Sequence, residues 1–454
     1  MKSETAARRI GWMGLALFCA GAQGIAMGAE TKEATGMSQN PAADFNTMRP
    51  IRNPQRMEIT VGQGEGDLQG SDDKVIQAAV DYVGRLGGGT VRILPGTYTM
   101  RNSIFLRSGI TLRGAGEKTV LRKAPSVSSP VVREADWFEY CVQVADAKGF
   151  TIGCGIAVQN KQADSEHDVT AVQLFTVTDI RGNVLYLDRR TEKDFWMEEG
   201  AKVQSLFSIL YGRSADNVTV EDIVLDGDRA ENERLNDNYG GACYGIYCNR
   251  WTLRNVIARD FNGDGFSFQV CDDWHFENCQ ALENADLGFH SGSGSQRPIF
   301  KNCVAKRNSE GLYWCWGACD GVAENCVLSD NLRYGTNFGH RDTDNVIRNC
   351  TIERNGVTGI VFRLEPGQNR QGDRNRIEGC TIRDNGGDAG QFGVDIKGQT
   401  REVTLVNCRF GNSQDGKQKV AIRIGPEAER ITLEGNSFTD CPVEVLDQRA
   451  ETGK

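Results

Sequence analysis

A repeat of 23 or 24 residues dominates the second half of the chain. The pair Asn-Cys recurs at Cys279, Cys303, Cys326 and Cys350, and each cysteine follows the previous one by 23 or 24 residues. A second column, in which a glycine precedes a short strand-like segment, begins at Gly265 and keeps the same spacing. Because the two columns stay in step, every repeat carries the same elements at the same places. Such a pattern is typical of a solenoid rather than of separate globular domains.

Short alternations of apolar side chains follow the glycines, as at Phe266 and Phe268 or at Ile360 and Phe362. A period near 23 with such strands favours coils of three short strands that stack about 4.8 Å apart. The leucine-rich repeat is the alternative, but its leucine consensus is missing. The sequence therefore predicts an all-β fold, a single right-handed parallel β-helix with an N-terminal capping helix. The asparagines beside each turn are expected to bond to one another along the stack.

The residues before the repeat are expected to form an export signal and a tether. Three basic residues lie within the first nine positions, and an apolar run follows over residues 10–20. This order is typical of a signal peptide, which we place at residues 1–29. A membrane anchor is the alternative, but the run is short for a span. Residues 30–58 are polar and without a period, which indicates a tether. We expect export to the periplasm or the extracellular space, and no later segment could span a membrane.

One solenoid is expected to occupy residues 59–446. At its start, Asp72 can cap a helix whose apolar positions within residues 75–83 follow a 3.6-residue period. The regular coil pattern is interrupted near 137–216, where segments of alternating apolar and polar residues indicate a β-rich insertion or irregular coils. Residues 447–454 are expected to form a C-terminal tail.

Charge and cysteine content bear on partners and cross-links. The 52 basic and 61 acidic residues argue against a nucleic-acid partner, which requires a dominant basic surface. Six of the 15 cysteines occupy the repeat column, where a small thiol packs well inside a coil. We predict free, buried thiols there, whereas Cys315 with Cys319, or Cys243 with Cys248, could form disulfides. The cysteine spacing predicts no metal site, since paired Cys-x-x-Cys motifs are missing.

Several segments of the central coils are similar to those of a known group of proteins. They lie at residues 263–269, 288–298, 315–317, 339–345 and 362–365. Over nearly all of residues 60–446, the chain resembles the right-handed parallel β-helix repeat proteins of the pectate-lyase-like superfamily. That superfamily includes polysaccharide lyases, glycoside hydrolases, uronan epimerases and phage tailspikes, so the resemblance implies no particular reaction. The ordered Asp, Gly-His-Gly and Arg-Ile-Lys motifs of polygalacturonases are absent.

Strand alternation predicts where a functional face lies. The second and fourth residues after each column glycine should point outward, and equivalent residues of successive coils should be neighbours. The candidate catalytic residues on this face are His290, Tyr313, His340, Arg341, Asp342, Arg363 and Glu365. The candidate substrate-binding residues are Gln269, Asp272, Asp273, Arg297, Trp316, Asn337, Asp344, Asp395 and Lys397. Together they cover about five coils, or roughly 20–25 Å, which suits several sugar units of a polysaccharide or oligosaccharide.

Each candidate also has a structural interpretation. Arg341 and Glu365 could form only a stacked ion pair, and His290 could cap a turn. Strict alternation would bury His340, unless the turn frees it. Asp342, like Asp344, could be a turn-former. What favours a functional site is that rare ionisable groups gather on one face of a few coils.

Three functions would use this face. In β-elimination, Arg341 or Arg363 would neutralise a uronate carboxylate, His290 or His340 would abstract the adjacent proton, and Tyr313 would protonate the leaving oxygen. In hydrolysis, Glu365 would form an acid and base pair with Asp342 or Asp344. The third is a surface that binds glycan without catalysis. No cofactor follows from the sequence, apart from a Ca²⁺ ion that the Asp272–Asp273 loop could bind.

Overall fold

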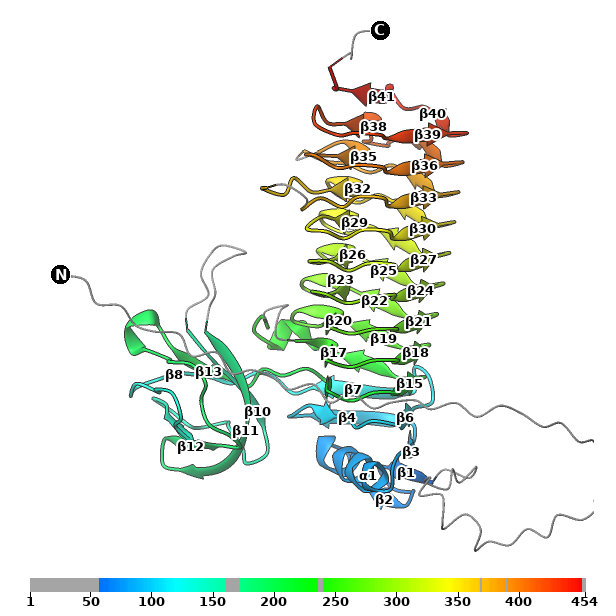
Figure 1. The fold of residues 1–454 in the computed structure, drawn as a ribbon. Helices are drawn as coiled ribbons and strands as arrows, with labels where there is room; N and C mark the ends of the chain where they lie inside the picture. The colour runs from blue at the N-terminus through cyan, green and yellow to red at the C-terminus, as the bar shows by residue number, and fades with distance from the viewer. Residues whose placement is uncertain (1–56, 161–170, 236–239, 368–369, 389, 451–454) are drawn as a thin grey trace, which may run out of the picture. The chain divides into compact units, whose positions relative to one another are not determined.

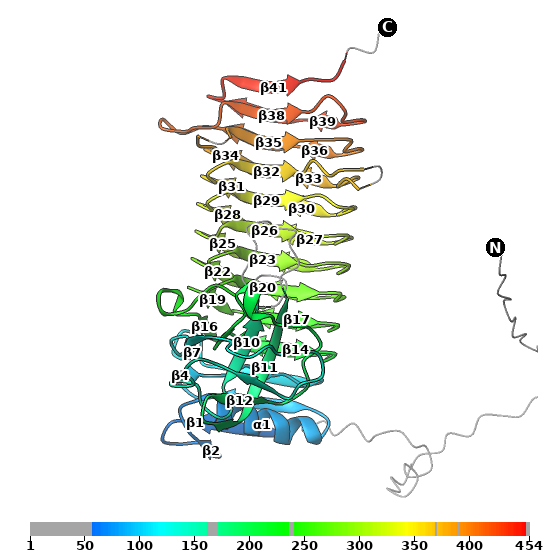
Figure 2. The same ribbon diagram turned by 90° about the vertical axis from the view of Figure 1, so that its left-hand side faces the viewer.

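Three sheets of short parallel strands form successive coils in the described part of the chain (Figures 1 and 2). The computed structural model describes residues 57–160, 171–235, 240–367, 370–388 and 390–450. All described residues belong to one compact unit, Gln55–Lys454. The predicted signal peptide, nearly all of the predicted tether and the last four residues of the predicted tail lie outside the described residues.

Each coil contributes one strand to each sheet, and the three sheets are named A, B and C here. Among the described residues, sheet A has 13 strands, in the order β2 (Leu68–Gln69), β1 (Glu58–Gly62), β3 (Gly89–Ile93), β6 (Ile110–Arg113), β15 (Thr219–Glu221), β18 (Thr252–Arg254), β21 (His275–Glu277), β24 (Ile299–Lys301), β27 (Val322–Glu324), β30 (Val346–Arg348), β33 (Arg376–Glu378), β36 (Thr404–Val406) and β39 (Thr432–Glu434). Sheet B has 11 in the same described ranges, namely β4 (Gly96–Met100), β7 (Thr119–Lys123), β16 (Val224–Asp226), β19 (Ile257–Arg259), β22 (Gln280–Leu282), β25 (Val304–Lys306), β28 (Val327–Ser329), β31 (Thr351–Glu353), β34 (Thr381–Arg383), β37 (Arg409–Gly411) and β40 (Ser437–Thr439).

Sheet C carries the face on which the candidate residues lie. Its 11 described strands are β5 (Ile104–Phe105), β14 (Leu210–Arg213), β17 (Gly241–Ile246), β20 (Asp264–Gln269), β23 (Leu287–Ser291), β26 (Glu310–Trp314), β29 (Tyr334–Phe338), β32 (Thr358–Phe362), β35 (Phe392–Ile396), β38 (Val420–Ile424) and β41 (Val443–Asp447). The strands pair in parallel, so that Phe266 lies beside Phe289 and Phe289 beside Leu312. The all-β parallel β-helix predicted from the repeat is confirmed. Strand β41 ends at Asp447, one residue inside the segment expected to be a tail.

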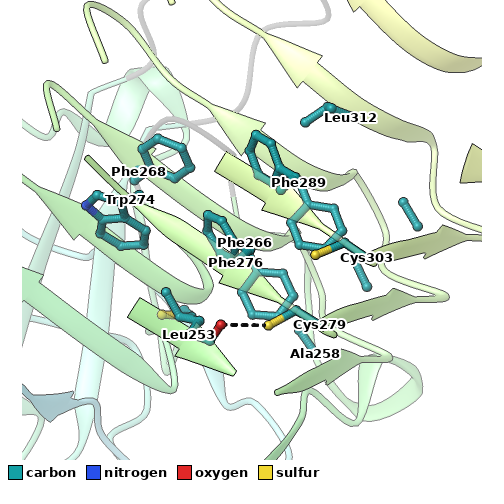
Figure 3. Close-up of a cluster of buried hydrophobic side chains, with 14 of the residues drawn as sticks. Leu253, Ala258, Phe266, Phe268, Trp274, Phe276, Cys279, Phe289, Cys303 and Leu312 are labelled. Atoms are coloured by element: carbon teal, nitrogen blue, oxygen red, sulfur yellow. Dashed lines mark hydrogen bonds between the residues drawn. The ribbon is translucent and has the colours of Figure 1, made fainter. Parts of the chain in front are cut away.

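The interior is built from columns in which like side chains stack (Figure 3). The ring of Phe266 stacks on Phe289 with centroids 5.0 Å apart, and Phe276 stacks on Phe300 at the same distance. The cysteines of the repeat column, Cys279, Cys303, Cys326, Cys350, Cys380 and Cys408, are buried and free, as predicted. The thiols of Cys243, Cys248, Cys315 and Cys319 are also free, so neither of the two disulfides considered above is formed.

Two ladders of asparagine side chains link the coils. The predicted one, beside the turns of the Asn-Cys pairs, is exposed: Asn302 Nδ2 donates to Asn278 Oδ1 at 3.2 Å. A second ladder is buried between sheets B and C, at Asn284, Asn308, Asn331, Asn355 and Asn385. Within it, Asn284 Nδ2 donates to Asn308 Oδ1 at 2.9 Å, and Asn308 Nδ2 donates to the Ala281 carbonyl at 2.9 Å. The buried ladder therefore satisfies polar groups that the turns would otherwise leave without partners.

A helix covers the N-terminal end of the solenoid (Figure 1). Helix α1 (Asp73–Arg85) begins after Asp72, whose side chain accepts a hydrogen bond from the Lys74 amide. The helix buries Ile76, Ala79, Val80 and Val83. The predicted capping helix is therefore present, and Val75 packs against the core only in part. No helix in the described residues is long and apolar enough to cross a membrane.

An antiparallel sheet interrupts the solenoid between β7 and β14. Its order is β8 (Ser128–Pro130), β13 (Lys202–Gln204), β10 (Gly155–Gln159), β11 (Val172–Arg181), β12 (Val184–Leu187) and β9 (Cys141–Gln143). The sheet has a hydrophobic core of its own around Val142, Ile156 and Phe195. The sheet spans residues 128–204, so it starts and ends earlier than the predicted 137–216. The insertion ends before β14, because this strand already pairs with β5 and β17 of the solenoid. The 3₁₀ turns Met197–Glu199 and Arg229–Glu231 lie in connections.

A buried lysine lies near the point where the insertion leaves the solenoid. Lys123 ends β7, and its Nζ donates to Asn262 Oδ1 at 3.1 Å. The same Nζ lies 4.7 Å and 5.1 Å from the ring centroids of Phe207 and Phe261. Burial lowers the pKa of Lys123 to about 7, because an ammonium group is poorly solvated in an apolar interior.

Candidate functional site

The outer face of sheet C brings the predicted residues of successive coils side by side. Phe266, Phe268 and Phe289 belong to the core, so the residues that alternate with them face outward. The register pairs His290 with Tyr313 and Tyr313 with Asn337. The expectation that equivalent residues are neighbours is therefore confirmed.

Arg363 is the centre of a polar cluster on this face. Its Nε donates to Glu365 Oε1 at 2.9 Å, and its Nη1 donates to Asn337 Oδ1 at 2.7 Å. Its Nη2 lies 3.3 Å from Asp342 Oδ2, and the guanidinium carbon lies 4.7 Å from the ring centroid of Tyr313. These contacts join four predicted residues to Arg363 and hold its guanidinium in one orientation.

The glycine of the preceding coil makes room for this cluster. A Cβ atom at Gly339 would lie 2.5 Å from Glu365 Oε1 and 2.6 Å from Arg363 Nε. Both distances are far below van der Waals contact, so a larger residue would displace the Arg363–Glu365 pair. Gly339 is therefore a local sequence requirement of the site.

His340 and Trp316 form a stacked pair at the rim of the cluster. Their ring centroids lie 4.2 Å apart and their planes differ by 4°. His340 Nδ1 lies 3.3 Å from Glu365 Oε2, and the histidine side chain is 13% exposed. The positive φ of His340, 40°, turns the chain out of the strand, so this side chain is not placed in the core as strict alternation would require. Trp316 is 48% exposed and offers an aromatic surface to solvent.

Asp342 is buried and ties two turns together. Its Oδ1 accepts hydrogen bonds from the amides of Gly317 and Ala318, and its Oδ2 accepts one from the Gly339 amide. Burial raises the pKa of Asp342 to about 6, although Arg363 and the three amides act in the opposite direction. Both carboxylate oxygens are thus engaged, as in the turn-forming interpretation.

His290 is not open to solvent, although strand alternation predicted that it points outward on the functional face. It is 1% exposed, its Nδ1 lies 2.8 Å from Asp264 Oδ2, and the Tyr313 ring meets it edge-on at 5.4 Å. Burial alone would lower the pKa of His290, but the charge of Asp264 and its hydrogen bond raise it well above the usual value. Neighbours on the adjacent strands cover the imidazole and favour its charged form.

Arg341 does not form the predicted ion pair with Glu365. Glu365 bonds instead to Arg363 and His340, and Arg341 is exposed with no ion pair to any described residue. Its φ of 70° belongs to the left-handed region. The column that strand alternation predicts therefore ends before Arg341, because the chain has already turned.

The other predicted binding residues are engaged outside the Arg363 cluster. Arg297 binds Asp273 at 2.7 Å and Asp272 at 3.1 Å, so these carboxylates form an ion-pair group rather than an open calcium loop. The remaining contacts are Asp344 with Arg374, Asp395 with Arg423 and Lys397, and Gln269 Oε1 with the Ser293 amide. Within the described ranges, no group of three or more His, Cys, Asp or Glu side chains could hold a metal ion.

Three cavities of about 450 to 560 Å³ lie away from the cluster. They are lined by turns between sheets B and C and by neighbouring strands of sheet B, around Lys417, Arg234 and Arg259. None of these three contains a residue of the Arg363 cluster. The candidate site is a partly exposed surface rather than one of these cavities.

Two carboxylates on the same face were not among the predicted residues. Asp264 binds His290, and Glu310 accepts a hydrogen bond from Asn337 at 2.8 Å and pairs with Arg333 at 3.2 Å. Each stands immediately before a column glycine. A search for acidic residues at that position of the repeat would have found both.

Comparisons with known proteins agree with this architecture. The family described as "Right handed beta helix region" matches residues 241–370. The A-module of the mannuronan C-5 epimerase AlgE4 of Azotobacter vinelandii has 17% identity and a TM-score of 0.51, over 86% of this chain and 100% of that chain. The chain is a right-handed parallel β-helix protein. The endo-xylogalacturonan hydrolase of Aspergillus tubingensis has 10% identity and a TM-score of 0.51, over 87% and 97% of the two chains. Identities this low concern the fold alone. No curated protein matches the β-helix chain in sequence.

Proposed function

We propose that the protein is exported, binds a uronate-containing polysaccharide on the outer face of sheet C and cleaves it by β-elimination. The observation that carries this proposal is the Trp316–His340 stack beside Glu365. An exposed indole is a suitable surface for the apolar face of a sugar ring. A histidine oriented by a carboxylate at its edge is suited to take a proton from that sugar.

Arg341 supplies the positive charge that such a substrate needs. Elimination requires the uronate carboxylate to be neutralised, because this makes the proton on the adjacent carbon more acidic. The Arg363 guanidinium is already bound to Glu365 and Asp342. Arg341 follows His340 directly, is exposed and has no ion pair within the described residues, so it is the better partner for a substrate carboxylate.

Tyr313 supplies a proton to the leaving group. Burial raises the pKa of its phenol well above the usual value, although the Arg363 charge acts in the opposite direction. The phenol therefore stays protonated at neutral pH and can act as an acid. In the proposed reaction, His340 takes the proton from C5 of the uronate and a C4–C5 double bond forms. The bond from C4 to the glycosidic oxygen breaks, and Tyr313 protonates that oxygen.

Hydrolysis by a pair of carboxylates has less support. Asp342 uses both oxygens to bind three backbone amides and Arg363. Asp344 lies outside the cluster and pairs with Arg374. Glu365 therefore has no second free carboxylate beside it among the predicted candidates. The names of two similar folds, a mannuronan epimerase and a xylogalacturonan hydrolase, support a polysaccharide as the substrate class.

A panel of uronate-containing polysaccharides tests the proposal. We expect products whose unsaturated ends absorb ultraviolet light, and we expect H340Q to abolish them. The control is H275Q, at an exposed histidine on β21 of sheet A. Reducing ends without ultraviolet absorption would contradict elimination and indicate hydrolysis.

A second candidate function is glycan binding without catalysis. It is favoured by the mutual pairing of Arg363, Asp342 and Glu365, which leaves these charges satisfied without a substrate. Binding of a polysaccharide that W316A weakens, with no product of either kind, would support this alternative and contradict the enzyme.

A further inference from the structure

Asp264, His290 and Cys315 form a diagonal line across the outer face of sheet C. Asp264 begins β20, His290 lies on β23, and Cys315 directly follows β26. His290 pairs with Tyr313, so Cys315, two residues further along, faces the same side as a diagonal neighbour. The Cys315 amide donates to the Ser291 carbonyl at 2.9 Å, which holds the cysteine beside the histidine strand.

The histidine of this line is oriented by its carboxylate. His290 Nδ1 lies 2.8 Å from Asp264 Oδ2, while Asp264 Oδ1 accepts a hydrogen bond from the Leu287 amide at 3.0 Å. An ionised carboxylate only accepts, so Nδ1 carries a hydrogen and donates. His290 Nε2 is buried and has no hydrogen-bond partner in the described part of the chain. A buried imidazole nitrogen without a partner calls for a functional explanation.

Cys315 is the group that can use this nitrogen. It is a free thiol and, at 8% exposure, the least buried of the three residues, since His290 is 1% and Asp264 0% exposed. A thiol near a histidine that a carboxylate orients is the arrangement of an activated nucleophile. We propose that Asp264, His290 and Cys315 form a catalytic triad in which Cys315 Sγ attacks the carbonyl carbon of a carboxylic acid ester.

The electrostatic surroundings agree with this arrangement. Burial has the largest single effect on the pKa of His290 and lowers it, whereas the charge and hydrogen bond of Asp264, together with the Cys315 sulfur as a thiolate, raise it well above the usual value. Transfer of the thiol proton to His290 then produces an ion pair that stabilises the thiolate. The groups facing His290 are Asp264 and Ser267 on one side and Tyr313 and Cys315 on the other.

The reaction balances without any further reactant except water. The Cys315 proton passes to His290, and the thiolate forms a bond to the ester carbonyl carbon. The bond from that carbon to the alcohol oxygen then breaks, and the alcohol leaves with the proton from His290. Water, deprotonated by His290, attacks the resulting thioester and releases the carboxylic acid and the thiol.

Alkylation by iodoacetamide tests the nucleophile. Cys319 is the matched control, because it is also free, lies four residues away and is more exposed than Cys315. Peptide mass spectrometry at pH 6 should show Cys315 alkylated at least about tenfold faster than Cys319, since only thiolate reacts. H290Q and D264N should each slow the alkylation of Cys315 by a similar factor and leave the alkylation rate of Cys319 unchanged. Equal rates for the two cysteines, or rates insensitive to both substitutions, would overturn the triad.

Ester turnover tests the reaction. With p-nitrophenyl acetate, the protein should release a burst of p-nitrophenol followed by steady turnover, and C315A should abolish both while C319A keeps them. If the unsubstituted protein released p-nitrophenol no faster than C315A does, ester hydrolysis by Cys315 would be refuted. No residue of the triad takes part in the proposed elimination. C315A should therefore still form ultraviolet-absorbing products from polysaccharide. The elimination assay and the ester assay thus test the two proposals independently.

Discussion

Replacement of Lys123 by methionine should change how stability depends on pH. Lys123 is 1% exposed, and its Nζ is held by Asn262 between the rings of Phe207 and Phe261. The ring contacts favour the ammonium form, but burial outweighs them and lowers the pKa from 10.5 to about 7. K123M keeps an unbranched chain of similar length and removes the titrating group.

The sign follows from proton binding. Between the folded pKa of about 7 and the unfolded value of 10.5, the unfolded chain binds a proton that the folded chain does not. The free energy of unfolding therefore rises with pH in this window, by at most about 1.4 kcal/mol per pH unit. From pH 7 to pH 9 the gain is about 2 kcal/mol, because Lys123 is still half protonated in the folded state at pH 7.

Urea denaturation of both proteins at pH 7, 8 and 9 measures this effect. K123M should be more stable than the unsubstituted protein at pH 7, and the difference should shrink by about 2 kcal/mol at pH 9. Comparing the two proteins cancels the other groups that titrate in this range. K301M, at an exposed lysine on β24, is the control and should give a constant difference. A constant difference for K123M as well would refute the reasoning.

Two further substitutions probe the coils and the site. N308A should destabilise the protein by about 3–5 kcal/mol in urea denaturation, because the Asn284 amide and the Ala281 carbonyl would lose buried partners. N302G, in the exposed ladder at a φ of 54°, should cost less than about 1 kcal/mol, and equal losses would contradict the distinction. W316A should weaken polysaccharide binding at least about tenfold in calorimetry with an unchanged melting temperature, since the indole is exposed. Unaltered affinity would remove Trp316 from the binding surface.

The fold followed from the sequence because one residue type fills one position in six successive coils. Cys279 and Cys303 occupy equivalent interior slots, so their spacing revealed the coil length directly. The buried asparagine ladder has the same regularity, from Asn284 through Asn308 to Asn331, and could have been found in the same way. The direction of side chains inside strands was therefore predicted, but not their exposure, since His290 on β23 faces outward and is still 1% exposed.

The site was predicted less completely because it lies where strands end. His340 and Arg341 have φ values of 40° and 70°, so alternation no longer tells which way their side chains point. Asp264 escaped notice for a related reason. A Cβ at Gly265 would meet the core atoms Asn284 Nδ2 and Ala281 Cβ, so two successive positions, Gly265 and Phe266, face inward. Strict alternation counted back from Phe266 would therefore turn Asp264 inward, whereas Asp264 faces outward and binds His290.

The buried asparagine ladder also has a consequence for how such a protein can change in length. Each asparagine takes its partners from the coils next to it, as Asn308 does with Asn284 and Asn331, so the same bonds form at every step. A duplicated or deleted coil would join its neighbours through an identical set of contacts. The longer coil between Asn355 and Asn385 still keeps the 2.9 Å bond, because its extra residues lie elsewhere in the coil. Each added coil would extend the outer face of sheet C by about 4.8 Å, close to the length of one sugar unit.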